Sequence, residues 1–103
     1  MEAGPPRINP TLLIEAATEK SDSDWNKAVR GDTMTDRGRK QIAHSIRVPM
    51  FAQQILRHTR ITDFECMLAL HEEIVTDPSP DTAHYAEVYG PIRADMLARL
   101  RVR

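Results

Sequence analysis

The chain has 103 residues, of which 41% are hydrophobic and 28% charged, and its formal net charge is −1 at pH 7. These values are typical of a single soluble globular domain and exclude a fully disordered chain. The single cysteine excludes an internal disulfide, and no apolar run approaches the roughly 20 residues of a membrane-spanning helix. We therefore expect a cytoplasmic protein without a membrane segment.

The N-terminal part predicts a lead-in followed by helices. Residues 1–9 contain a Gly-Pro-Pro run and are expected to form a flexible segment. Pro10 suits the first turn of a helix, so a helix is predicted to begin there. A second short helix is expected to begin within residues 21–25, where Ser21 or Ser23 can cap it, and to end at Gly31.

The central part predicts two helices separated by a break. Thr35 or Asp36 can cap the first of them, and apolar residues then recur at helical spacing as far as Ile46. Pro49 is predicted to end this helix and to start the next one, because proline is tolerated in a first turn but not in a helix interior. The second helix should extend to His58.

The C-terminal part predicts three further helices around one linker. Thr62 and Glu65 have the spacing of a capping box, so a helix is expected to start there. Residues 77–81 read DPSPD and are the clearest linker of the chain. Two short helices are expected beyond it, over residues 83–90 and 91–103.

Charge is distributed unevenly along the chain. Residues 26–60 carry eight basic and two acidic side chains, a net charge of +6, whereas residues 1–25 carry −3 and residues 61–103 carry −4. Phosphate binding depends on such local fields more than on the total charge. A solvated helix surface would carry the same charges, so the pattern leaves both interpretations open.

Residues 40–58 combine a small residue, a short connection and a polar helix. Ala43 is small enough for a second helix to cross over it, and Pro49 can open that second helix. The stretch resembles the helix-turn-helix family of DNA-binding proteins, which includes phage repressors and bacterial transcription regulators. Arg47 and Gln53 depart from the family, which prefers a glycine and an apolar residue there. The resemblance implies a small transcriptional regulator that binds double-stranded DNA sequence-specifically and occupies an operator.

The resemblance assigns roles to the polar residues of this stretch. Glutamine can pair with adenine, arginine with guanine, and methionine can touch a thymine methyl group. The expected base-contacting residues are Met50, Gln53, Gln54 and Arg57. The expected phosphate-contacting residues are Arg37, Arg39, Lys40, Arg47 and Arg60.

Such proteins commonly bind DNA as dimers on two-fold operators. The last helix carries Met96, Leu97 and Leu100 along one side, and these residues are the expected interface of a homodimer. The alternative is that they pack on their own domain. The acidic C-terminal third is a further candidate surface for a protein partner.

Catalysis is not expected. The four histidines lack the spacing of a metal motif, and the sequence has no Gly-rich phosphate loop or nucleophile elbow. Residues 49–65 also resemble part of the substrate- and flavin-binding signature of flavin-dependent thymidylate synthases, through Arg57, His58 and Glu65. Thr59 and Phe64 replace the arginine and asparagine of that signature. We therefore expect no catalytic residue, metal or cofactor.

Together these patterns predict an all-α fold of about five to six helices. A helical domain over residues 10–76 would contain the helix-turn-helix at residues 36–58, and residues 82–103 would form C-terminal helices. The alternative function is a small helical protein–protein interaction module, such as a phage or plasmid adaptor or inhibitor of a host protein, without DNA binding. Salt separates the two, because only phosphate contacts weaken steeply with ionic strength.

Overall fold

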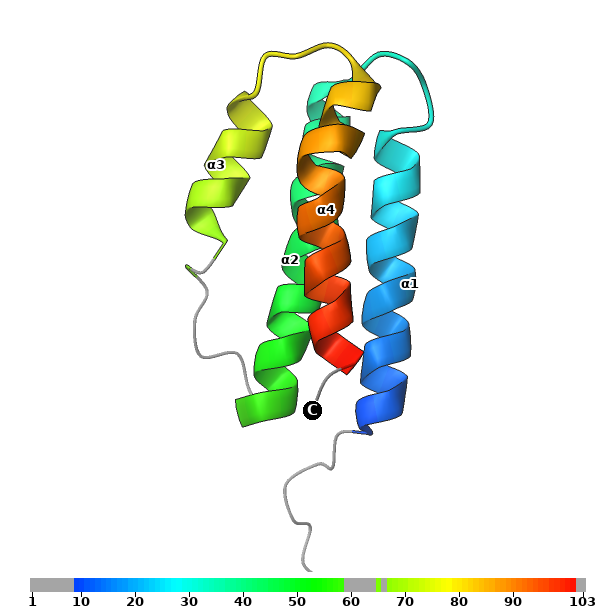
Figure 1. Cartoon of the computed structure of the whole chain (residues 1–103), viewed down its shortest axis with the longest axis vertical. Helices are drawn as coiled ribbons and strands as arrows, with labels where there is room; N and C mark the ends of the chain where they lie inside the picture. Colours follow the sequence, from blue (N-terminus) through cyan, green and yellow to red (C-terminus); the bar gives the residue numbers. More distant parts are fainter. Residues whose placement is uncertain (1–8, 59–64, 66, 102–103) are drawn as a thin grey trace, which may run out of the picture.

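The computed structural model describes residues 9–58, 65 and 67–101, and these residues form an all-α bundle, as predicted (Figure 1). Three long helices lie side by side, and a short helix packs against one of them, α2. In chain order the helices are α1 (Pro10–Ala28), α2 (Asp36–His58), α3 (Leu68–Thr76) and α4 (Thr82–Arg101). There are thus four helices in the described chain rather than five or six, because the predicted breaks at Ser21, Pro49 and Pro91 fall inside continuous helices. Among these residues, no helix combines the length and apolar character needed to cross a bilayer.

α1 is one helix, and the predicted helix start at Ser21 is wrong. The cap lies further upstream, where the Asn9 side chain accepts hydrogen bonds from the backbone N–H groups of Thr11 (3.0 Å) and Leu12 (3.2 Å). Ser21 is fully buried, and its Oγ donates to the backbone oxygen of Ser45 in α2 at 2.6 Å. Its hydroxyl therefore joins two helices instead of capping one.

α2 is also continuous, so the predicted helix break and helix-turn-helix turn at Pro49 are wrong. Proline has no backbone N–H, so Pro49 leaves the carbonyl of Ser45, four residues earlier, without its intrahelical donor. The hydroxyl of Ser21 supplies that donor from α1. Arg93 Nη1 of α4 donates in turn to Ser21 Oγ at 3.2 Å. The cost of a proline inside α2 is thus offset by a hydrogen bond that also connects the bundle.

The predicted start of α2 near Thr35 and Asp36 agrees with the structure. Thr35 Oγ1 accepts a hydrogen bond from the backbone N–H of Gly38 at 2.9 Å, as expected of a cap. Residues 77–81 connect α3 to α4. α4 continues through Pro91, so the predicted break there is wrong. The capping residue Thr62 lies outside the described residues, as do residues 1–8; α3 itself begins at Leu68.

The core consists of two apolar clusters that share α1, α2 and α4. The larger cluster includes Trp25, Ile42, Ile46, Ile74, Tyr85 and Tyr89. The smaller cluster is formed by Ala17, Ala52 and Leu100 near the other end of the bundle. α4 therefore contributes to the same core as the first two helices.

The three residues expected at a dimer interface take part in this packing to different degrees. Leu100 is only 1% exposed, Leu97 packs against the smaller cluster and Met96 against the larger one. Leu100 is therefore not available to a second chain, and this part of the expected interface is corrected. Met96 and Leu97 are partly buried, and the homodimer itself stays a prediction.

The contact between Ser21 and Ser45 can be tested by a double-mutant cycle with Pro49. Ser21→Ala should lower the free energy of unfolding by about 1–3 kcal/mol, because it leaves the buried Ser45 carbonyl unpaired. In a Pro49→Ala background the same change should cost clearly less, because the new N–H can satisfy that carbonyl. Urea denaturation of the four proteins measures both costs. An equal cost in the two backgrounds would contradict the proposed role of Ser21.

Candidate functional site

α2 is the central helix, and one of its sides is left uncovered by the other helices of the described chain. α1 and α3 flank it, and α4 lies across a third side (Figure 1). Residues spaced alternately by three and four positions line one side of a helix. On the uncovered side of α2, here called the open face, these residues are Arg37, Lys40, His44, Arg47 and Phe51.

The first half of the open face is cationic. Residues 37–58 contain no aspartate or glutamate, and Arg37 and Lys40 are exposed. Lys20 of α1 lies beside these residues of α2. Its Nζ is 3.2 Å from Asp24 Oδ1, and the Oδ2 atom of the same carboxylate is 3.5 Å from His44 Nε2. Lys27 follows Lys20 by seven residues on the same side of α1. The set consisting of Lys20, Lys27, Arg37, Lys40 and Arg47 is called the cationic row below.

The carboxylate of α1 beside the cationic row, Asp24, is nearly buried. The Asp24 side chain is 7% exposed, and its Oδ2 accepts no hydrogen bond from the described residues. His44 lies between it and Arg47, whose Nη2 is 2.7 Å from His44 Nδ1. A guanidinium can only donate, so Nδ1 accepts and the neutral ring carries its proton on Nε2, facing Asp24. The surface potential here is consequently set by the lysines and arginines.

The surroundings of His44 favour its neutral form. Burial lowers the pKa of its imidazole below the ordinary value of 6.5, and Arg47 and Lys20 act in the same direction, whereas Asp24 raises it. Protonation would also place a second donor against the Arg47 guanidinium, which removes the hydrogen bond at Nδ1. At neutral pH His44 thus serves as a neutral spacer between Asp24 and Arg47.

The second half of this side of the molecule is apolar. A groove of about 280 Å³ lies between the N-terminal part of α1 and the C-terminal part of α2. It is lined by Leu13, Ala16, Ala17, Val48, Phe51, Ala52 and Ile55. Three small alanines among larger side chains create the hollow. Phe51 belongs both to the open face and to the groove, so the cationic and apolar parts adjoin.

Some of the predicted site residues lie on or near the open face of α2. Arg37, Lys40 and Arg47 lie on the open face. Gln54 follows Arg47 by seven residues on that side, and Arg57 is exposed near the end of the helix. Of these residues, Arg37, Lys40 and Arg57 are exposed.

Two expected base contacts do not have the required orientation. Met50 packs against the larger core cluster. Gln53 is half-buried, and it follows the buried Ile46 by seven residues and Pro49 by four, so it lies on the bundle side of α2. The helix continues through Pro49, and this keeps both residues in phase with the core. The expectation that Met50 and Gln53 face outward is therefore corrected.

Arg39 was expected to contact phosphate, and this is also corrected. Its side chain is 13% exposed, and its Nε donates to the backbone oxygen of Asp77 at 2.8 Å and to the Tyr85 hydroxyl at 2.9 Å. Its Nη2 donates to the backbone oxygen of Ser79 at 3.1 Å. Through these hydrogen bonds the Arg39 guanidinium connects α2 to the segment between α3 and α4. Arg60 lies outside the described residues.

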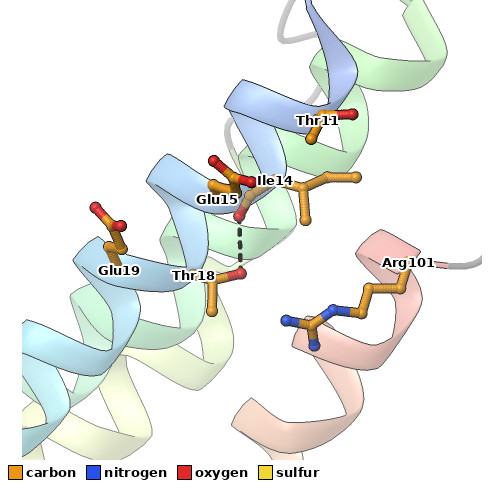
Figure 2. A pocket seen from close by; sticks show the side chains of 6 residues that line it. All are labelled: Thr11, Ile14, Glu15, Thr18, Glu19 and Arg101. Carbon is orange, nitrogen blue, oxygen red and sulfur yellow. Dashed lines mark hydrogen bonds between the residues drawn. The ribbon is translucent and has the colours of Figure 1, made fainter.

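A second cavity, of about 410 Å³, lies between α1 and the end of α4 (Figure 2). Arg101 extends across it toward α1, whereas the Glu19 carboxylate points away (Figure 2). The Thr18 hydroxyl donates to the backbone oxygen of Ile14 at 2.7 Å, so it is used within the helix. The charged groups that line this cavity do not converge on one position. The cavity therefore differs from a preorganised ligand site, in which polar groups point to a common ligand position.

Comparisons with known proteins add no assignment. No family model matches the chain, and neither curated protein sequences nor solved structures return a match. Within the described part of the chain, no group of three or more metal-ligating side chains is close enough to hold a metal ion. The candidate site is therefore defined by the geometry of the α1–α2 side alone, that is, the cationic row together with the apolar groove.

The position of His44 predicts a specific pH dependence of stability. Between pH 6.5 and the lower pKa of folded His44, the unfolded chain binds a proton that the folded chain does not. The free energy of unfolding should therefore fall as the pH decreases through this range. In His44→Gln, which keeps a donor toward Asp24, the fall should be smaller. Urea denaturation between pH 7.5 and pH 5 compares the two; parallel pH profiles would contradict the assignment.

Proposed function

We propose that the chain is a small helical interaction module that binds another protein through the α1–α2 side. The observation that carries this proposal is the apolar groove, open to the surface, directly beside a row of cations. Apolar surface at the centre of a contact and charges at its margin are the usual anatomy of a protein–protein interface. An adaptor or an inhibitor acts in this way without any chemistry of its own.

The shape of the α1–α2 side is better suited to binding a protein than to inserting a helix into the major groove of DNA. A recognition helix must protrude so that its residues reach base edges. α2 instead lies between α1 and α3, and two of its four expected base-contacting residues turn toward the bundle (Figure 1). The groove lined by Phe51 and Ile55 offers apolar contacts, whereas DNA presents phosphates at its surface.

Site-specific photo-crosslinking in the native host cells tests the proposed function. Phe51 is replaced by p-benzoylphenylalanine, and the matched control carries the same group at Val88, which is 44% exposed on α4. Irradiation should yield a protein adduct of discrete mass from position 51 only. Identical adducts from the two positions, or none from position 51, would argue against a protein-binding role for this side.

A second candidate function is binding to the phosphate backbone of double-stranded DNA by the cationic row. The absence of any carboxylate across residues 37–58 favours it, because no acidic side chain of α2 beyond Asp36 would repel phosphates.

Salt-dependent binding to a random-sequence duplex tests the DNA alternative. If the row neutralises phosphates, affinity should fall steeply between 50 and 200 mM salt, and Lys40→Glu should reduce the salt slope by about one or more. Arg99→Glu on α4 is the matched control, since Arg99 lies outside the row. No measurable binding at 50 mM salt would exclude this candidate.

A further inference from the structure

We infer that the partner element is an amphipathic helix with carboxylates in one half and bulky apolar side chains in the other. This inference rests on the proposed function and names the chemistry of the occupant. It follows from three properties of the α1–α2 side: its length, its division into two halves and the shape of the groove.

The two halves form one strip along α2. Within this strip, Lys40 and Ile55 are 15 positions apart in one continuous helix, and this corresponds to about 22 Å at 1.5 Å per residue. Arg47 and Phe51 are four positions apart, so the change from cationic to apolar occurs within one turn. A partner helix of about 15 residues covers such a strip.

Charge complementarity defines one half of the occupant. Two carboxylates lie beside the cationic row: Asp24 is 7% exposed and forms an ion pair with Lys20, and Asp36, at the start of α2, forms an ion pair with Arg39. The remaining charges of the row are all positive. Lys40 and Arg47 are seven positions apart on α2, and two carboxylates spaced by two turns on a neighbouring helix match them. A basic partner would face like charges and be excluded.

The apolar groove defines the other half of the partner helix. It lies between two antiparallel helices and is lined by apolar residues of both, which is the surface that a third helix fills with large side chains. Recognition by strand addition needs a sheet edge, and the described residues at this site belong to helices. Leucine, phenylalanine or methionine at helical spacing would therefore occupy the hollow above Ala16, Ala17 and Ala52.

Selection from a display library of random 20-residue peptides on the full chain tests the inference. Enriched peptides should carry Asp or Glu in one half and large apolar residues at i, i+3 or i+4, and i+7 in the other. They should gain helical circular dichroism on binding. Failure to enrich any acidic–apolar peptide, or enrichment of basic peptides, would overturn the inference.

Variants locate the binding site of a selected peptide by fluorescence anisotropy. Ala16→Trp fills the groove from an exposed position, so the fold should be retained, and it should weaken binding about tenfold or more. Lys40→Glu combined with Arg47→Glu should weaken binding about tenfold at 50 mM salt and less at 300 mM. The matched controls Val88→Trp and Arg99→Glu should bind as the unmodified chain does. Equal affinity of the Ala16→Trp variant would overturn the assignment to the groove.

Other occupants give different results. A concentration-dependent dimer in sedimentation experiments that Ala16→Trp abolishes would show that a second copy of the chain occupies the groove, which overturns the inference. A crosslink from position 51 without selection of acidic–apolar peptides would leave the proposed function in place and reject this partner chemistry. Absence of both the crosslink and the peptides would reject the proposed function as well.

Discussion

The continuity of α2 through Pro49 depends on one hydrogen bond, in which Ser21 Oγ donates to the Ser45 backbone oxygen at 2.6 Å. Pro49 deprives this carbonyl of its partner within α2, and an unpaired carbonyl in a buried position is costly. The donor from α1 removes that cost and sets the register of α1 against α2. Arg93 extends the contact to α4 by donating to the same hydroxyl and, at 2.7 Å, to Asp22.

The continuity of α2 determines what the surface of the molecule can do. Because residues 36–58 form one helix, cationic and apolar residues line the same side of a single rod instead of belonging to two crossing helices. α1 completes the groove with Leu13, Ala16 and Ala17. At the other side of α2, Arg39 binds the linker, so that α3 stays against α2 and bounds the open face. An elongated surface with two chemically distinct halves results.

Part of the proposed binding surface was visible in the sequence. The charge pattern predicted Arg37, Lys40 and Arg47 as phosphate contacts, and the structure places all three on the open face, with Arg37 and Lys40 exposed and Arg47 half-buried. A long run without acidic residues can be read without tertiary information. The groove was missed. Its only trace in the sequence is a set of alanines, Ala16, Ala17 and Ala52, and small residues predict a hollow only when the helices that bear them are known to pack together. The same reason explains why Lys20 was not assigned to the cationic row.

The sequence by itself determined the all-α class, the cap at Thr35 and the linker over residues 77–81, since these depend on local periodicity and on residue types with strong backbone preferences. The tertiary structure decided the structural roles of Ser21, Pro49 and Arg39. A serine can cap a helix or bond to a neighbouring one, and a buried proline breaks a helix unless another element satisfies the carbonyl that it frees. Those choices depend on groups more than 20 residues away, as the pair of Ser21 and Ser45 shows.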